Sequence, residues 1–161
     1  SRNMPVHNVV YRTARVADIP ALSALLAQLF AIESDFQSDP DKQARGLRLL
    51  IEQSHKHPKP TACIFVAQIN EKVIGMCTVQ VLISTAEGGA VALVEDVLVD
   101  EQYRGRGIGR GLLDELEAWA RARGLTRLQL LVDADNQPAI DFYAKNGWTG
   151  TRLQALRKLL K

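Results

Sequence analysis

The sequence predicts an α+β sandwich, in which helices flank a mixed and mostly antiparallel central sheet. Two apolar runs, 62–69 and 73–84, are joined by three residues, which is typical of an antiparallel hairpin. A third run, 91–99, leads through a glycine-rich turn into an amphipathic segment. This pattern indicates a strand, a helix and a right-handed crossover to the next strand. The predicted order is β-α-α-β-β-β-α-β-α, followed by one or two closing strands in the tail.

Length and composition favour one soluble domain. The chain has 161 residues and a net charge of +2 with mixed signs, which argues against a nucleic-acid-binding surface. Its apolar runs are shorter than a membrane span and no signal peptide opens it, so we expect a cytoplasmic protein. Cys63 and Cys77 stand singly, and no metal site is expected. Residues 1–3 are interpreted as an expression scar, which leaves a domain over 4–161.

Two helices are expected between the first strand and the hairpin. The first strand covers 9–15, and Asp18 is expected to cap a helix that runs to about Glu33. A second helix is predicted over 41–55. Its buried side chains are expected to be Leu47, Leu50 and Ile51.

The second half of the chain is expected to hold two more helices. The helix after the glycine-rich turn should bury Ile108, Leu112, Leu116 and either Trp119 or Ala120. A strand is predicted over 126–132 and a short helix over 138–146. The tail, 148–160, is apolar at intervals and is interpreted as the closing strands.

The turn at 102–110 is predicted to bind phosphate. The first N–H groups of a helix have no partner, and glycines let an anion approach the backbone closely. Three arginines, Arg104, Arg106 and Arg110, are interleaved with the glycines and add positive charge. The spacing does not match the G-x-G-x-x-G dinucleotide fingerprint or the P-loop, which leaves another phosphate compound.

Two motifs resemble the GNAT family of N-acetyltransferases. Arg104, Gly107 and Gly109 match the family's [QR]-x-x-G-x-[GA] acetyl-CoA motif, between a strand and a helix. The segment 130–148 resembles the family's strand, Asn-x-x-Ala loop and aromatic helix. Together with Glu95 and Asp96, this block is most similar to diamine and other small-amine acetyltransferases.

The resemblance implies that acetyl-CoA is the co-substrate. The acetyl group would pass directly to a primary amine of a small molecule, such as a polyamine, an amino acid or a related metabolite. Acetylation of a protein N-terminus or lysine is one alternative, and a non-catalytic CoA-binding regulatory module is another. A homodimer through the C-terminal strands or the sheet edge is also compatible with the sequence.

The resemblance also implies catalytic roles. Glu95 is the first candidate for the general base and Asp96 the second, and strand alternation predicts that their side chains point to opposite faces. Tyr143 matches the tyrosine that would donate a proton to the departing thiolate. A backbone N–H near Val97, at a bulge, would polarise the thioester carbonyl.

The binding residues follow from the same resemblance. The cofactor is expected to contact Val97, Leu98, Val99, Arg104, Gly105, Arg106, Gly107, Ile108, Gly109, Arg110, Asn136, Ala139 and Tyr143. The acceptor is expected near Phe30, Glu33, Asp35, Gln80 and Glu95.

Overall fold

The computed structural model describes residues 8–33 and 37–160. The elements in chain order are β1 (Val10–Thr13), η1 (Val16–Asp18), α1 (Ile19–Ile32), α2 (Pro40–Ser54), β2 (Ala62–Ile69), β3 (Lys72–Ser84), β4 (Gly89–Val99), η2 (Glu101–Tyr103), α3 (Ile108–Ala122), β5 (Leu128–Leu130) and α4 (Gln137–Lys145). This order confirms the predicted sequence of strands and helices as far as α4. Within the described part of the chain, no helix is both long and apolar enough to cross a membrane.

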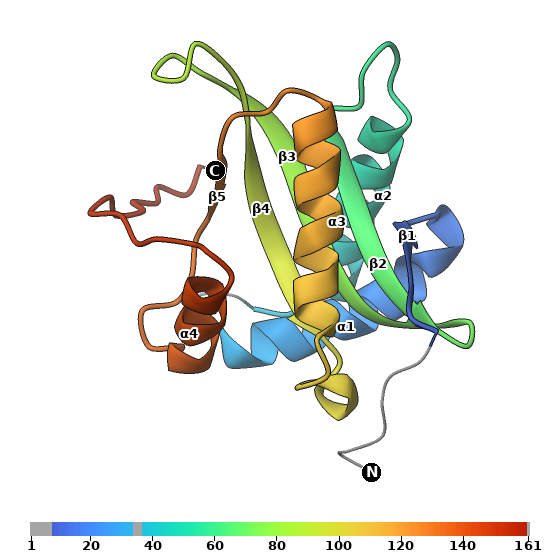
Figure 1. Ribbon diagram of the computed structural model, residues 1–161. Coiled ribbons are helices and arrows are strands. Elements are labelled where there is room, and N and C mark those ends of the chain that lie inside the picture. The colour runs from blue at the N-terminus through green and yellow to red at the C-terminus, as the bar shows by residue number, and fades with distance from the viewer. Residues whose placement is uncertain (1–7, 34–36, 161) are drawn as a thin grey trace. The chain divides into compact units, whose positions relative to one another are not determined.

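The chain divides into two compact units, Ser1–Gln129 and Leu130–Lys161. The first unit is built on a sheet whose strand order is that of the chain, β1 to β5 (Figure 1). The pairs β1–β2, β2–β3 and β3–β4 are antiparallel. At the other side of β4, Thr126 donates to the carbonyl of Ala90 and Ala92 donates to that of Arg127. Because these bonds advance in the same direction along both segments, β5 enters parallel to β4.

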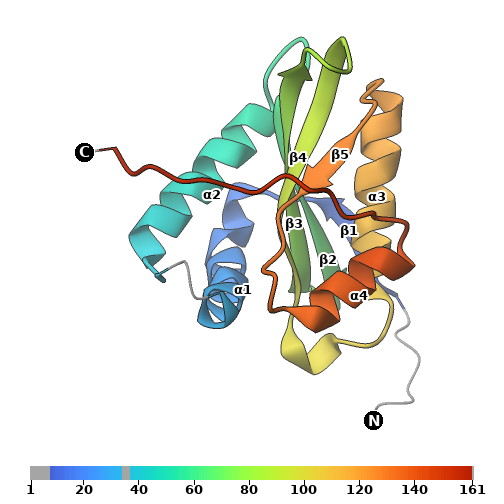
Figure 2. The same cartoon turned by 90° about the vertical axis from the view of Figure 1, so that its left-hand side faces the viewer.

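Helices cover both faces of this sheet. Two views show α1 and α2 on one face and α3 on the opposite face (Figures 1 and 2). Beneath α1 and α2 the core includes Leu22, Leu25, Leu47, Val66 and Met76. The inner side of α3 buries Ile108, Leu112, Leu113, Leu116 and Ala120, as its sequence periodicity predicts. The two layers bury both faces of β2 and of the first half of β3, whereas the second half of β3, from Gln80 onward, is largely exposed.

Asp18 occupies the N-cap position of α1, but its side chain does not cap the helix. It accepts two hydrogen bonds from the Arg12 guanidinium, at 2.8 and 2.9 Å, and one from the Arg15 N–H at 2.7 Å. The Arg12 hydrogen bonds and charge lower the pKa of this buried carboxyl, in spite of its desolvation. The predicted cap is therefore replaced by an ion pair that ties β1 to the start of α1.

The second unit contains α4 and the tail. Asn136 caps α4 by accepting a hydrogen bond from the Ala139 N–H at 3.2 Å. The predicted closing strands are wrong, because residues 148–160 form no strand. Four leucines of the tail are largely exposed: Leu153, Leu156, Leu159 and Leu160. Their spacing lacks the alternation of a strand, so an extended tail has no apolar face with which to pair against a sheet.

Candidate active site

A bulge interrupts β4 at the two adjacent acids. Thr78 of β3 pairs with Glu95 and Met76 pairs with Leu98, so that Asp96 and Val97 together lie opposite one residue of β3. Asp96 has a left-handed backbone with φ of 52°. Strand alternation predicts that the two carboxylates point to opposite faces, but side chains do not alternate regularly through a bulge, so this expectation stays a prediction.

The Asp96 carboxyl lies in a partly buried and acidic environment. The Thr78 hydroxyl, which is buried, lies 3.3 Å from Asp96 Oδ2 and 3.1 Å from the Glu95 carbonyl. Burial raises the pKa of Asp96 to about 6, and the charges of Glu95 and Glu33 add to this increase, against the Thr78 hydrogen bond, which lowers it. A carboxyl with such a pKa can exchange a proton near neutral pH.

Asp96 also lines an open cavity of about 300 Å³ between α1 and α2. The other lining residues are Leu26, Phe30, Gln37, Asp39, Lys42, Gln43, Gly46, Leu47 and Leu50. Among the residues expected at the acceptor, Phe30 lies in this lining and Glu33 follows the last turn of α1. Glu95 and Gln80 are exposed and do not belong to the lining, and Asp35 lies outside the described residues.

The turn after β4 presents backbone donors. Gly105 and Gly107 have left-handed φ values of 76° and 80°, which side chains disfavour, and α3 begins directly after Gly107. The Gly111 N–H donates to the Gly107 carbonyl, so the N–H groups of 108–110 belong to the free first turn of the helix. This first turn and the glycines form an anion-binding geometry.

The arginines of this turn have different surroundings. Arg104 folds back, and its Nε donates to the Val99 carbonyl at 3.0 Å. Arg106 lies over the Tyr103 ring, 5.4 Å from its centroid, and Lys72 lies 5.6 Å from the same ring. The sequence analysis missed Tyr103 and Lys72, because the hairpin turn that brings Lys72 to η2 is far from it in the chain.

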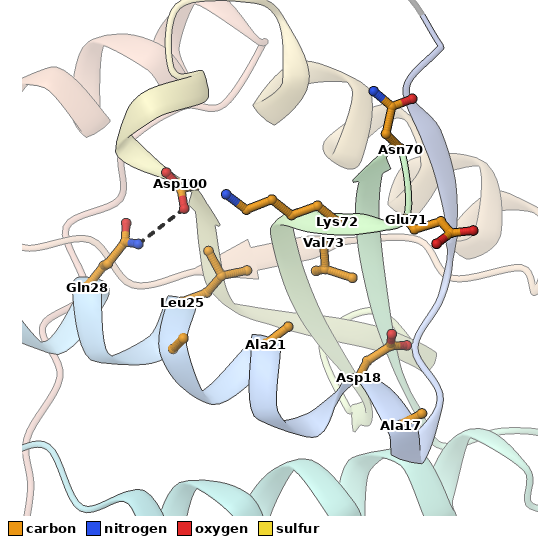
Figure 3. Close-up of a pocket in the computed structure, with 11 residues that line it drawn as sticks. Ala17, Asp18, Ala21, Leu25, Gln28, Asn70, Glu71, Lys72, Val73 and Asp100 are labelled. Atoms are coloured by element: carbon orange, nitrogen blue, oxygen red, sulfur yellow. Dashed lines mark hydrogen bonds between the residues drawn. The ribbon is translucent and has the colours of Figure 1, made fainter.

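A larger cavity, of about 450 Å³, lies between the start of α1 and the β2–β3 turn (Figure 3). Gln28 donates to Asp100 there at 3.4 Å, and Lys72 extends between the hairpin and Asp100. Neither Glu95 nor Asp96 belongs to its lining. The smaller cavity is therefore the one that has the bulge carboxyl in its lining.

Three expected site residues belong to the second unit. Asn136 and Ala139 form the cap of α4. The Tyr143 ring contacts the edges of two aromatic neighbours, Phe142 and Trp148, with centroids at 5.3 and 5.8 Å. The Tyr143 ring therefore takes part in the packing of the second unit.

Comparison with known proteins decides the family. Residues 26–148 match the sequence profile of the Acetyltransferase (GNAT) family, which is more than half of the chain. The chain belongs to the GNAT acetyltransferase family. Acetyl-CoA is the co-substrate of this family, and the motif residues identified above lie within the matched range.

Relatives and solved structures agree with this assignment. An uncharacterised N-acetyltransferase of Methanocaldococcus jannaschii is 35% identical over 85 residues, which is 52% of this chain and 38% of the relative. A glucosamine 6-phosphate N-acetyltransferase of Trypanosoma brucei brucei is 30% identical over 86 residues, 53% of this chain and 56% of the relative. These matches therefore span less than two thirds of either relative.

The whole fold of this GNAT chain has counterparts among solved structures. A predicted acetyltransferase of Clostridium acetobutylicum, solved with acetyl-CoA, superposes with a TM-score of 0.74 at 18% identity. The superposition covers 94% of this chain and 96% of the other. The predicted GNAT fold is thereby confirmed.

Proposed function

We propose that this GNAT protein transfers the acetyl group of acetyl-CoA to the primary amine of a small molecule, such as a polyamine, an amino acid or a related metabolite. The observation that carries the proposal is the α1–α2 cavity, which has the bulge carboxyl of Asp96 in its wall. A carboxylate in a small cavity suits a protonated amine, both as a counter-charge and as the acceptor of its proton.

Asp96 is better supported as the base than Glu95, the first candidate from the sequence. An alkylammonium has a pKa near ~10.4 and must lose a proton before its nitrogen can attack. Asp96 lines the cavity and its pKa is about 6, whereas Glu95 is exposed. In the proposed step the ammonium proton passes to Asp96, and the neutral amine nitrogen forms the new C–N bond as the thioester C–S bond breaks. The departing thiolate takes a proton, which the family resemblance assigns to the Tyr143 hydroxyl. The nitrogen then releases its second proton, which replaces the one given to the thiolate.

The turn at 104–110 is proposed to bind the pyrophosphate of acetyl-CoA. Support comes from the left-handed Gly105 and Gly107 and from the free N–H groups of the first turn of α3. Arg106, which lies over the Tyr103 ring, supplies a positive charge beside this turn. Val97, Leu98 and Val99 are proposed to pair with the pantetheine arm, and Asn136 and Ala139 to contact the cofactor.

The test is acetyl-CoA-dependent thiol release with a panel of small amines, amino acids and short peptides. We expect release with small amines, and a rise of kcat/KM with pH through about 6, as Asp96 loses its proton. Asp96→Asn should lower kcat/KM by roughly 100-fold or more and remove this acidic limb. Glu95→Gln is the matched control and should keep the limb.

Other outcomes would redirect the proposal. Release with peptides alone would assign the protein to protein acetylation. Binding of acetyl-CoA without release for any acceptor would favour a regulatory CoA-binding module. An unchanged pH profile in Asp96→Asn would remove Asp96 from the base role.

A further inference from the structure

The α1–α2 cavity combines apolar walls with one carboxylate that lacks a basic partner. Its sides include Leu26, Phe30, Leu47 and Leu50. Asp96 is the acid of the bulge, and no ion pair joins it to a Lys or Arg among the described residues. A bound cation at this carboxylate would therefore be its first basic partner within the described structure.

The other two charged residues of the lining, Asp39 and Lys42, have opposite signs. Asp39 and Lys42 both lie at the start of α2, where the Asp39 side chain accepts a hydrogen bond from the Lys42 backbone N–H at 3.2 Å. The charges that face Asp96 are those of Glu95 on its own strand, Glu33 after α1, and the Asp39 and Lys42 pair of α2. The balance of these groups is acidic, which favours positive charge in the cavity.

Gln43 adds a hydrogen-bonding group without a partner. Its Nε2 lies 3.4 Å from the Ser38 hydroxyl, but its Oε1 is buried and has no hydrogen-bond partner among the described residues. Gln43 belongs to the same lining. Buried carbonyl oxygens are rarely left without a donor, so a shift of the Gln43 side chain toward the cavity would let this oxygen accept a hydrogen bond from a bound molecule.

Gly46 leaves space in the wall. It lies within α2, where glycine is less favourable than alanine, and a Cβ built on it would meet nothing within 4 Å. Neither the backbone conformation nor a close neighbour requires glycine at this position. Gly46 is exposed, so the missing side chain leaves the cavity open at this point of its rim.

We propose, resting on the acetyl transfer proposed above, that the acceptor is a primary monoamine with an apolar aliphatic or aromatic body, and that Gly46 sets the largest body that fits. The ammonium lies toward Asp96, and the body lies among Phe30, Leu47 and Leu50. A polyamine is disfavoured, because its second ammonium would lose water among apolar side chains on the same wall as Lys42.

The test is calorimetric titration of four amines into the protein, with and without CoA. Hexylamine and 2-phenylethylamine are the apolar probes, ethylamine is the small probe and spermidine is the polyamine. In the wild type, the two apolar probes should bind at least about tenfold more tightly than ethylamine or spermidine.

Gly46→Leu should fill the space and weaken binding of 2-phenylethylamine and hexylamine by about tenfold or more, while ethylamine changes by less than about twofold. Arg48→Leu is the matched control, because it adds the same side chain at an exposed position of α2 outside the lining. If Gly46→Leu does not fold, Gly46→Ala takes its place and should weaken the binding of 2-phenylethylamine by a smaller factor. Asp96→Asn should weaken the binding of all four amines.

Several results would overturn this inference: tighter binding of spermidine or ethylamine than of the apolar probes, equal affinities in Gly46→Leu and the wild type, or no amine binding at all. A separate acetyl-CoA titration distinguishes failure of the proposed acetyl transfer from failure of the apolar-acceptor assignment. Turnover of polar amines alone would retain acetyl transfer and reject the apolar acceptor. Binding of the apolar amines without binding of acetyl-CoA would retain the cavity assignment and reject acetyl transfer.

Discussion

At the scale of single residues, Asp96 is held in a conformation and an environment that cost stability. Its left-handed backbone and its partial burial are both unfavourable for an ionised aspartate. Aspartate and asparagine tolerate the left-handed region better than most residues, so Asp96→Asn removes the charge without a new backbone cost. The variant therefore separates the effect of the charge from that of the bulge.

Asp96→Asn should raise the free energy of unfolding at neutral pH. Folding raises the pKa of Asp96 from an ordinary 3.8 to about 6, so the folded state binds this proton more tightly. The contribution of Asp96 to stability falls as pH rises from about 4 through about 6, by up to about 3 kcal/mol. The difference in unfolding free energy between Asp96→Asn and the wild type should grow over the same range and level off above it.

Urea unfolding at several pH values between 4 and 8 measures this difference. Asp18 has a lowered pKa, so its contribution to the free energy of unfolding increases with pH. Because both proteins contain Asp18, this contribution cancels in the comparison. A difference that is flat with pH would contradict the proposed environment of the Asp96 carboxyl.

At the scale of elements, two helical glycines have opposite roles. Gly46 of α2 faces open space, whereas a Cβ on Gly111 of α3 would collide with the ring and hydroxyl of Tyr11 from β1. Gly111 thus allows the edge strand and the helix to approach closely. The pKa of the Tyr11 hydroxyl is raised, first by burial and then by the charges of Asp114 and Glu115, in agreement with this packing against α3.

The two glycines predict opposite effects of the same substitution. Gly46→Ala should stabilise the protein by about 0.5 to 1 kcal/mol through helix propensity. Gly111→Ala should destabilise it by about 1 to 3 kcal/mol, because Tyr11 must move. Thermal unfolding of both variants measures the two changes in stability. A loss of stability in Gly46→Ala would mean that the wall of the cavity is closed at this position.

At the scale of the whole molecule, the two units differ in how their apolar side chains are used. In the first unit, buried leucines such as Leu22, Leu112 and Leu116 are completely excluded from solvent. In the second unit, the tail leucines are among the most exposed apolar residues, and Leu156 is 95% exposed. The tail therefore contributes little to the core within one chain.

Matched substitutions test this contrast. Leu156→Ala should change the free energy of unfolding by less than about 0.5 kcal/mol, since the side chain has few contacts to lose. Leu116→Ala should cost about 2 to 5 kcal/mol, through lost burial and a cavity beneath α3. Chemical denaturation at two protein concentrations provides the measurement. A large, concentration-dependent effect of Leu156→Ala would instead indicate that the tail is covered by another chain.

The sequence alone predicted the secondary structure as far as α4 and the glycine-rich turn at 104–110, because these depend on local patterns. The periodicity of Ile108, Leu112 and Leu116 and the residue types of the turn are properties of short segments. The prediction for the tail was wrong because it also relied on a local pattern. Apolar residues at intervals do not form a strand unless another segment pairs with them.

The tertiary structure decided the arrangement of the acids and of the cavity. The register against β3 introduces a bulge at Asp96 and Val97, and Asp96, unlike Glu95, lies in the wall of the cavity between α1 and α2. Its raised pKa depends on burial and on Glu33, which is far away in the chain. Such properties arise where distant segments meet, and no local pattern in the sequence encodes them.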